Sequence, residues 1–507
     1  MINSRRYKSG RRVELPQSKA AWRLSSRLPG GLLPSTQAKA TLGDAFKKMY
    51  ELDTIVAPAT APGTASIAVI RLSGPDSIRV LKIIWVPKRA VDLKPRRLYL
   101  GEIRDPITHA AVDRAMATIM PGPKSFTGED VAELHCHGGP YLVRRVIALA
   151  MRYGARLANP GEFTRRAFLN GRIDLTEAEA IADLISARSE VALGQALGQL
   201  SGALSDRVRD LRRQLIAIRA HLEAEIDFSD EDIALPSRDQ IARAIDSLRA
   251  DLRILHDSFE RGRLIRDGAR AAIIGKPNAG KSSVMNLMLG SDRAIVTPHP
   301  GTTRDVIEES VALGPHALVI QDTAGLRHSA DPVERIGIER AIARVTDADF
   351  VLAVFDSSRP LDSDDARVIE AARGRCGLAI LNKRDLPSIL TRKSLRAAGL
   401  KLEIVALSAL DPLDLSPLKD ELSKILETLG GDFGSEPLRI SRERHRDSLA
   451  RAIASLTEAY DSATRGLPPE ITAVDISAAA DSLDQLTGSI TTDDILDTIF
   501  REFCIGK

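Results

Sequence analysis

The feature that most constrains the fold is a glycine-rich loop at residues 275–282, which reads Gly-Lys-Pro-Asn-Ala-Gly-Lys-Ser. It follows the short apolar run 271–274 and leads into residues 283–287, a pattern that predicts strand, loop and helix. Glycines at this spacing let backbone N–H groups turn toward phosphate oxygens, and the helix start adds its positive dipole end. We therefore predict a P-loop in which Lys281 reaches the β- and γ-phosphates and Ser282 ligates Mg²⁺.

Four further motifs follow in the order expected of a GTP-binding domain. Residues 301–305 include a switch threonine, and residues 322–325 offer a carboxylate for Mg²⁺ and a glycine amide that senses the γ-phosphate. In the base motif at 382–385, Asp385 can accept two N–H donors from guanine, which adenine does not offer, and Ser408 and Ala409 complete the pocket. The motifs predict a Ras-like P-loop G domain at residues 267–430.

The predicted GTP contacts come from all five motifs. They are Asn278, Ala279, Gly280, Lys281, Ser282, Ser283, Thr297, Pro298, His299, Pro300, Gly301, Thr302, Thr303, Asp322, Thr323, Ala324, Gly325, Asn382, Lys383, Asp385, Ser408, Ala409 and Leu410.

Leu326 stands where Ras-like GTPases carry the glutamine that orients the attacking water. Leucine cannot orient water, so another group must do so. The acidic segment 331–335 lies close to the switch in sequence, and Glu334 is the candidate. The alternative is that Glu334 is a solvated carboxylate at a helix start.

The first 48 residues form a basic leader that we exclude from the fold. They hold eleven Lys or Arg against Glu14 and Asp44. Three interpretations remain open: a mitochondrial transit peptide, which would place the protein in the matrix, a start codon wrongly assigned upstream of Met49, or a basic arm that contacts nucleic acid. Otherwise we expect a cytoplasmic protein, because its three cysteines are too few for a disulfide framework and no apolar run is long enough to span a membrane.

Residues 49–170 alternate short apolar runs with Gly and Pro, which predicts a small α+β domain. The expected strands lie at 65–72, 97–101, 115–120 and 131–137. In the last of these, His135 and His137 would face one side of the sheet and Cys136 the other, so we predict no zinc site there.

The pattern becomes helical after Asp174, and Thr176 with Glu179 suggests a capping box. Apolar residues then recur at helical spacing over 204–226 and 241–259, which predicts a hairpin of two helices broken at Pro236. The same spacing resumes at 449–460 and 495–499. We infer that residues 171–266 and 431–507 form one helical domain into which the G domain is inserted, leaving through the glycine-rich segment 430–435.

Several segments outside the G domain carry a resemblance to a known family. They are residues 53–57, 71–74, 126–130, 159–164 and 167–170, together with the ending Cys504, Ile505, Gly506 and Lys507. With the five GTPase motifs, they make the chain resemble the MnmE (TrmE) family of tRNA-modifying GTPases over almost all of its length after Met49. The resemblance implies a multidomain α/β protein: an N-terminal α+β domain that binds folate and dimerises, a helical domain, and the inserted G domain.

The resemblance also implies an activity and partners. With an FAD-dependent protein of the MnmG/GidA type, in a heterotetramer, such a homodimer installs an aminomethyl-type group, commonly carboxymethylaminomethyl, on carbon 5 of the wobble uridine of tRNA. The one-carbon donor, 5-formyltetrahydrofolate or a related folate, would contact Arg71, Glu133, Arg172 and Lys507. Arg172 stands where relatives carry lysine, which keeps the charge but changes the donor geometry.

For the GTPase reaction, the resemblance implies activation by K⁺ across paired G domains. Asn278, Thr297, His299 and Thr302 would hold K⁺, Ser282 and Thr303 would hold Mg²⁺, and Glu334 would hold the water network. Lys281, Glu334 and Cys504 are the catalytic candidates. A Cys504 thiolate could attack an activated carbon, or the tail could simply close the folate pocket.

The alternative function is a regulatory or ribosome-assembly GTPase without modifying chemistry, because Era- and Der-like proteins share the same P-loop. A second G domain or a KH module would favour that alternative, and the sequence shows neither. The tRNA surface is assigned only as a hypothesis, to Arg165, Arg166 and Arg172.

Overall fold

The computed structural model describes residues 53–228, 236–290, 309–314, 316–320, 345–346, 348–430 and 438–507. The predicted leader, the residues 297–303, 322–326 and Glu334 of the G domain, and the exit segment 431–435 lie outside the described residues. None of the described helices is long and apolar enough to cross a membrane.

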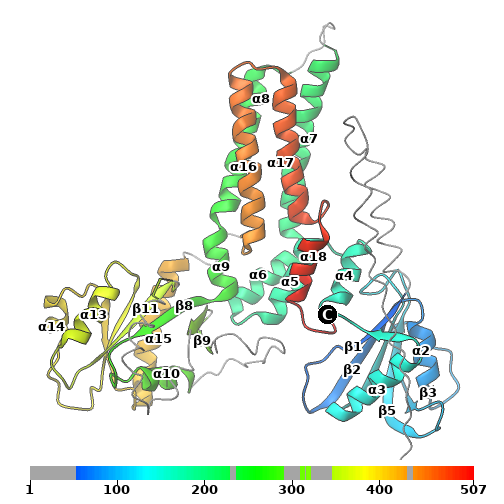
Figure 1. The fold of residues 1–507 in the computed structure, drawn as a ribbon, viewed down its shortest axis with the longest axis horizontal. Helices are drawn as coiled ribbons and strands as arrows, with labels where there is room; N and C mark the ends of the chain where they lie inside the picture. Colours follow the sequence, from blue (N-terminus) through cyan, green and yellow to red (C-terminus); the bar gives the residue numbers. More distant parts are fainter. Residues whose placement is uncertain are drawn as a thin grey trace, which may run out of the picture. The chain divides into compact units, whose positions relative to one another are not determined.

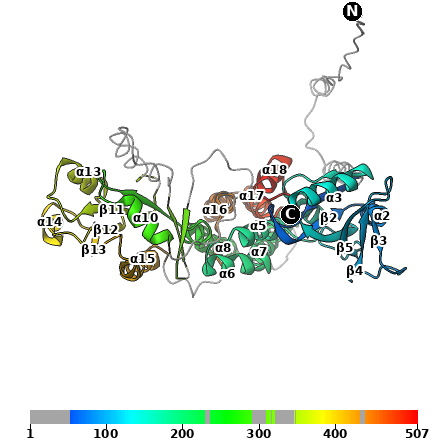
Figure 2. The ribbon, with the colours of Figure 1, turned by 90° about the horizontal axis from the view of Figure 1, so that it is seen from below.

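The N-terminal domain is built on a seven-stranded sheet in the order β3-β4-β5-β6-β2-β1-β7. Only the β1–β7 pair is parallel. Helices α2 and α3 pack side by side on one face of this sheet (Figures 1 and 2). The elements are β1 (Thr54–Pro58), β2 (Ala65–Ser73), α2 (Ser77–Ile84), β3 (Trp85–Pro87), β4 (Tyr99–Arg104), β5 (Ala111–Met120), β6 (Val131–Gly138), α3 (Pro140–Arg152) and β7 (Ala155–Leu157).

Alternation along the strands decides which side chains this domain buries. Ile70 and Leu72 of β2 enter the core under the helices, while Arg71 between them faces the other side. On β6, Cys136 is buried and His137 is exposed, in line with the predicted opposite orientation of the two side chains. No group of three or more His, Cys, Asp or Glu side chains in the described part of the chain could hold a metal ion.

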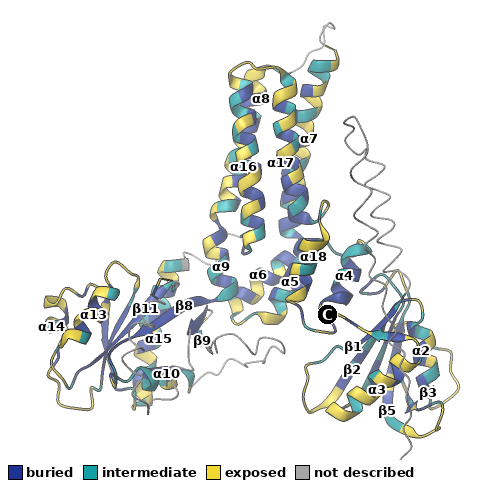
Figure 3. Ribbon diagram, viewed as in Figure 1, coloured by how far each residue is buried: buried dark blue, intermediate teal, exposed yellow. Residues whose placement is uncertain are grey.

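The helical domain is a bundle of α7 (Ala203–Asp227), α8 (Arg238–Asp257), α16 (Glu443–Thr464) and α17 (Pro469–Thr487), which run side by side (Figure 1). Their apolar stripes face inward and form one core, visible as the buried side of each helix in Figure 3. Because this core unites helices from before and after the G domain, the predicted insertion is confirmed.

The predicted hairpin of α7 and α8 needs a correction. The two helices follow each other in the chain, but α7 packs mainly against α17, and α8 mainly against α16. An amphipathic stripe shows that a helix has a buried face without identifying the helix that covers it.

Shorter helices lie together at one end of the bundle (Figure 1). They are α4 (Glu162–Leu169), α5 (Leu175–Ser186), α6 (Glu190–Leu200), α9 (Phe259–Asp267) and α18 (Asp493–Arg501). The capping box of α5 is formed by Asp174 and Glu177, so the prediction of Thr176 and Glu179 is wrong by two residues. Glu179 is instead fully buried, where it pairs with His445 at 2.7 Å and with Arg444 at 2.9 Å.

The G domain has a six-stranded sheet in the order β13-β12-β11-β8-β10-β9, parallel except for the β9–β10 pair. Every described side chain of β10 and β11 is buried, as expected for strands covered on both faces. The elements are β8 (Ala269–Ile274), α10 (Lys281–Leu289), β9 (Glu309–Leu313), β10 (His316–Ile320), β11 (Phe350–Asp356), α13 (Ser363–Ala371), β12 (Gly377–Asn382), α14 (Arg392–Ala397), β13 (Glu403–Ala406), the 3₁₀ turn η1 (Pro412–Asp414) and α15 (Leu415–Gly430).

Candidate functional site

The P-loop connects β8 at the centre of the sheet to α10, as predicted. Gly280, the residue before α10, has φ +95°, and a Cβ there would overlap the Asn382 amide nitrogen. The Lys281 ammonium donates to the carbonyl oxygens of Gly275 and Lys276, both at 2.9 Å, so the loop wraps around its own lysine. Both features belong to a loop that admits phosphate close to its backbone.

The residues predicted to read the base come together beside this loop. Asn382 Nδ2 donates to the Ala279 carbonyl, and Asn382 Oδ1 accepts from the Ala409 N–H, both at 3.0 Å. The Ser408 hydroxyl donates to Asp385 Oδ1 at 2.6 Å, which orients the carboxylate. Leu410 contributes only a backbone contact to Ser408, and its side chain is 80% exposed.

Three charged residues that the sequence analysis missed hold this pocket together. Asp356, at the end of β11, accepts from the Lys383 ammonium at 2.6 Å. Asp414 accepts from the Ser408 N–H at 2.7 Å. Lys276, buried inside the P-loop, donates to two carboxylates at the start of α13, at 2.9 and 2.7 Å. The position of Asp356 after the apolar run 350–355 was the one signal that could have revealed it.

The pKa of the Asp356 carboxyl lies below its usual range. Burial alone would raise that pKa, but the Lys383 ammonium and the hydrogen bonds from Ser358 outweigh it. Asp356 is therefore a charged carboxylate that fixes Lys383, whose backbone is itself in the left-handed region at φ +65°.

A second cluster forms on the face of the N-terminal sheet opposite α2 and α3. Arg71 and Glu133 are direct neighbours on β2 and β6, and their side chains pair at 2.8 Å. The Arg71 guanidinium also lies 5.7 Å from the ring of Phe126 and 5.9 Å from that of Phe163. The arrangement offers a cation, a carboxylate and two aromatic rings at one place.

The tail of residues 504–507 reaches this cluster from the far end of the sequence. Ile505 bridges to Pro160, and the N–H groups of Gly161 and Phe163 donate to the carbonyls of Cys504 and Lys507 at 3.4 and 3.2 Å. The pKa of the Lys507 ammonium lies below its usual value, because of burial and then the nearby Arg71 charge. Lys507 is thus brought into electrostatic range of Arg71 and Glu133.

Arg172 lies at the edge of this region. It is exposed, and a Cβ at Gly128 would lie 3.3 Å from Arg172 Cγ, so it borders the loop that carries Phe126. Among the described residues, Glu133 pairs with Arg71 and His135, and Arg172 is not one of its partners.

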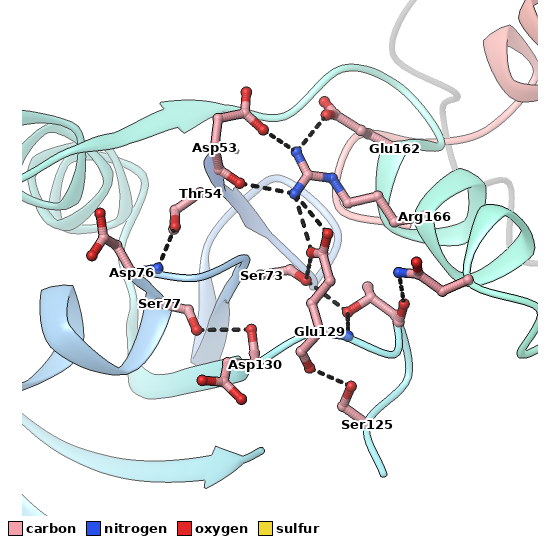
Figure 4. A network of polar contacts seen from close by, with 12 residues as sticks. Asp53, Thr54, Ser73, Asp76, Ser77, Ser125, Glu129, Asp130, Glu162 and Arg166 are labelled. Carbon is pink, nitrogen blue, oxygen red and sulfur yellow. Dashed lines mark hydrogen bonds and ion pairs between the residues drawn. The ribbon is translucent and has the colours of Figure 1, made fainter. Parts of the chain in front are cut away.

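A buried ionic network lies between the loop 125–130 and α4, and Figure 4 shows it at close range. Arg166, 2% exposed, donates to Asp53 at 2.5 Å, to Glu129 at 3.1 Å and to Glu162 at 3.1 Å. The Ser73 hydroxyl donates to the same Glu129 at 2.7 Å. Because Ser73 lies two residues from Arg71, the network fixes the strand and the loop that supply Arg71 and Phe126.

Burial corrects the hypothesis that Arg165 and Arg166 form a tRNA surface. Arg166 is enclosed by three carboxylates, and Arg165 is mostly buried and held by Asp497 at 2.7 Å. Of the three proposed arginines, only Arg172 is exposed.

Models of known families match almost all of the described chain. The model of the GTP-binding protein TrmE N-terminus matches residues 54–172, and that of the MnmE helical domain matches residues 175–504. The tRNA modification GTPase MnmE of Syntrophotalea carbinolica is 44% identical over 461 residues, which cover 90% of this chain and 100% of the relative. The chain belongs to the MnmE family. The protein of the same name from Heliobacterium modesticaldum is 42% identical over 463 residues, with 90% of this chain and 99% of the relative covered.

Family membership confirms the predicted multidomain α/β fold and the prediction of a GTP-hydrolysing enzyme of tRNA modification. It leaves the individual site residues as predictions. Those described by the structure gather in two places, the P-loop with its base pocket and the Arg71–Glu133 cluster with the tail.

Proposed function

We propose that this chain is a potassium-stimulated GTPase that, with an FAD-dependent partner, installs an aminomethyl-type group on carbon 5 of the wobble uridine of tRNA. The group, commonly carboxymethylaminomethyl, takes its carbon from a folate such as 5-formyltetrahydrofolate. The chain acts as a cytoplasmic homodimer and forms a heterotetramer with the partner. The observation that carries the proposal is the presence, in one chain, of a guanine-type base pocket and of the 504–507 tail docked beside Arg71 and Glu133.

The P-loop fits GTP with Mg²⁺. When GTP binds, Lys281 would exchange its two carbonyl partners for the β- and γ-phosphates. Ser282, in the first turn of α10, and Thr303 would ligate Mg²⁺. Asp385, oriented by Ser408, accepts the two N–H groups of guanine. Mg²⁺ supplies the charge that stabilises the transferring phosphoryl group.

The K⁺ proposal is supported by Asn278. Its backbone is in the left-handed region at φ +61°, and its exposed side chain makes no hydrogen bond to any described residue, so the amide oxygen is available to a cation. In this role, K⁺ supplies positive charge near the phosphates, and Glu334 orients the water that Leu326 cannot orient. Thr297, His299 and Thr302 are the other proposed ligands.

The chemistry of the Arg71–Glu133 cluster suits a reduced folate. A pterin offers N–H donors that a carboxylate such as Glu133 can accept, and the glutamyl carboxylates of a folate suit the cations Arg71, Lys507 and Arg172. The partly exposed Phe126 supplies apolar surface for a flat ring, and the fully buried Phe163 supports the cluster from the core. Cys504 is held in the tail by backbone contacts, as a tail that closes the pocket requires, and its thiol remains a candidate nucleophile.

The decisive test is GTP hydrolysis by the full chain in KCl and in NaCl at matched ionic strength. We expect a large loss of rate in NaCl, and a similar loss for Asn278→Ala in KCl. Glu370→Ala, an exposed carboxylate near the end of α13 in the same domain, is the control and retains the wild-type rate in both salts. Equal rates in both salts would contradict the K⁺ site and favour a conventional switch GTPase.

The folate proposal is tested separately by titration calorimetry with 5-formyltetrahydrofolate. Arg71→Met should weaken binding by about 10- to 100-fold, because a charge-assisted hydrogen bond contributes about 1.5–3 kcal/mol. Arg114→Met, an exposed arginine on β5, is the matched control. Equal affinity of the two variants for the folate would show that the folate does not bind at this cluster.

A further inference from the structure

The N-terminal domain carries an unusual concentration of positive charge on its helical side. Residues 77–97, which form α2, β3 and the loop to β4, hold seven Lys or Arg and a single acid, Asp92. The whole of residues 53–507 holds 60 Lys or Arg against 65 Asp or Glu, so the rest of the described domains is acidic by comparison. The positive net charge is therefore a local feature of these 21 residues and not a property of the whole chain.

Every one of these seven cations is exposed. Lys82, Lys88, Arg89, Lys94 and Arg97 form no ion pair with any carboxylate that the structure describes. Of the other two, Arg79 pairs with Asp76, and Arg96 donates to the backbone carbonyl of Lys124. Most of this positive charge is therefore not neutralised within the domain.

Helix α3 extends the same surface. It contains three arginines and no acid, and its Arg144 and Arg145 are exposed, as is Tyr141, whose side chain is 71% accessible. The loop belongs to the same side of the sheet, because Leu93 and Tyr99 pack against the core that α2 and α3 cover. We call α2, α3 and the loop 88–98 together the basic face.

We propose that the basic face binds the phosphate backbone of RNA, and that tRNA is its occupant. The inference rests on the proposed function, which supplies an RNA substrate. Unpaired guanidinium and ammonium groups bind phosphate oxygens, and an exposed tyrosine among them can stack on an unpaired base. An anionic membrane is the other polyanion that such a surface could bind, and the tRNA chemistry of the family favours RNA.

The basic face and the folate-type cluster lie on opposite sides of one sheet. Ile70 and Leu72 point to the helices, whereas Arg71 between them points away. RNA on the basic face therefore does not occupy the space around Arg71 and Glu133. Substitutions on the basic face should change RNA affinity without changing folate affinity or GTP hydrolysis.

The test uses the full chain with Arg89→Glu, Lys94→Glu and Arg97→Glu combined, all three in the loop and outside regular elements. The probe is bulk tRNA in a filter-binding titration from about 50 to 200 mM KCl. The control combines Arg392→Glu, Lys393→Glu and Lys401→Glu, three exposed cations of the G domain without a described ion pair, so the change in charge is identical.

We expect the loop variant to lose at least about tenfold in tRNA affinity at 100 mM salt and to lower the slope of log K against log[salt] by about two to three. The control should retain wild-type binding. A second variant, Arg144→Glu with Arg145→Glu on α3, should weaken binding as well and guards against a local folding defect in the loop.

Four outcomes would overturn the proposal, the first three of which concern the variants. They are equal losses in the loop variant and the control, unchanged tRNA binding in the loop and α3 variants, and loss of binding to phosphatidylserine vesicles with tRNA binding retained. A wild-type chain that binds no tRNA at 50 mM salt would also overturn it. Potassium-dependent GTP hydrolysis, measured on the same samples, shows whether the proposed function itself stands.

Discussion

Gly506 offers a sharp test of the docked tail, because its backbone leaves no room for a side chain. Its φ is +98°, and a Cβ would overlap the Pro58 carbonyl oxygen while lying 2.9 Å from the Pro58 carbonyl carbon and 3.3 Å from Ala59 Cα. These neighbours are backbone atoms at the end of β1 and of the residue after it, so they cannot yield as a flexible side chain would. Gly506→Ala must either distort β1 or release the tail.

Release is the less costly response. The docked tail gains two backbone hydrogen bonds, from the N–H groups of Gly161 and Phe163, and the first of them belongs to the bridge between Pro160 and Ile505. At about 1 kcal/mol net for each, these two bonds contribute about 2 kcal/mol. The left-handed backbone alone costs alanine about 1–2 kcal/mol, and the overlap costs more, so the total exceeds what docking contributes. We expect the tail of Gly506→Ala to be undocked in most molecules, with the melting temperature almost unchanged.

Two assays follow the tail. The first assay is alkylation of Cys504 in a Cys376→Ser background, which removes the exposed cysteine; Cys136 is buried, so the signal comes from Cys504. Alkylation should become faster in Gly506→Ala, because the undocked tail exposes the Cys504 thiol. Affinity for 5-formyltetrahydrofolate should fall by about 10- to 100-fold, because the Lys507 ammonium leaves the cluster. The control is Gly399→Ala, which also places alanine at a positive φ, +92°, but has no atom within 4 Å of the added Cβ. It carries the backbone strain without the overlap and should leave both assays unchanged. Wild-type alkylation and affinity in Gly506→Ala would refute this account of the tail.

Three further predictions follow from the buried charges and the base pocket. Arg166→Met should lower the free energy of unfolding by about 3–5 kcal/mol, since it removes the cation that pairs with Glu129 and leaves Asp53 and Glu162 with Arg156 alone; urea denaturation measures this, with Arg79→Met on the surface as the control, and a loss below about 1 kcal/mol would contradict the network. Asp385→Asn should weaken GTP binding at least about 100-fold and improve binding of xanthosine triphosphate, whose carbonyl can accept from the asparagine amide. Fluorescence titration with both nucleotides measures the two affinities. An unchanged preference for GTP would show that Asp385 does not contact the base. Burial alone would raise the pKa of Glu179, but the charges of His445 and Arg444 outweigh burial and hold that pKa far below its usual value. The charged form of Glu179 therefore stabilises the fold above about pH 4.5, and this stabilisation is lost as the pH falls. Melting temperatures between about pH 5 and pH 3 should therefore fall more steeply for the wild type than for Glu179→Gln, with Glu443→Gln behaving as the wild type, and parallel curves would refute the assignment.

Local patterns allowed much of the fold to be predicted from the sequence. The P-loop and the base motifs are contiguous, and each follows an apolar run, so their residues and their strands could be named together. Strand alternation likewise predicted that Cys136 would face the opposite side of the sheet from His135 and His137, and Cys136 is the buried residue of the three. These features depend on neighbours within a few positions, which a single sequence displays directly.

The missed features depend on residues far apart in the chain. Arg166 contacts Glu129 and Asp53, 37 and 113 positions away, and Lys276 contacts Asp365, 89 positions away. An arginine in an exposed-looking run such as 165–166 gives no sign of such partners. The capping box of α5 was misplaced for a related reason: Asp174–Glu177 and Thr176–Glu179 both fit the local pattern, and only the burial of Glu179 against His445 separates them.

The docked tail also sets the order in which the protein can become competent during its synthesis. The strands and loops that carry Arg71, Phe126 and Glu133 leave the ribosome early, whereas Lys507 follows residue 172 by roughly 330 positions. At about 5–20 residues per second, that interval lasts about 20 to 70 seconds. For that time the first domain can fold, but its cluster lacks the residues that complete it. The cluster can therefore be completed only after the helical domain and the inserted G domain have been synthesised.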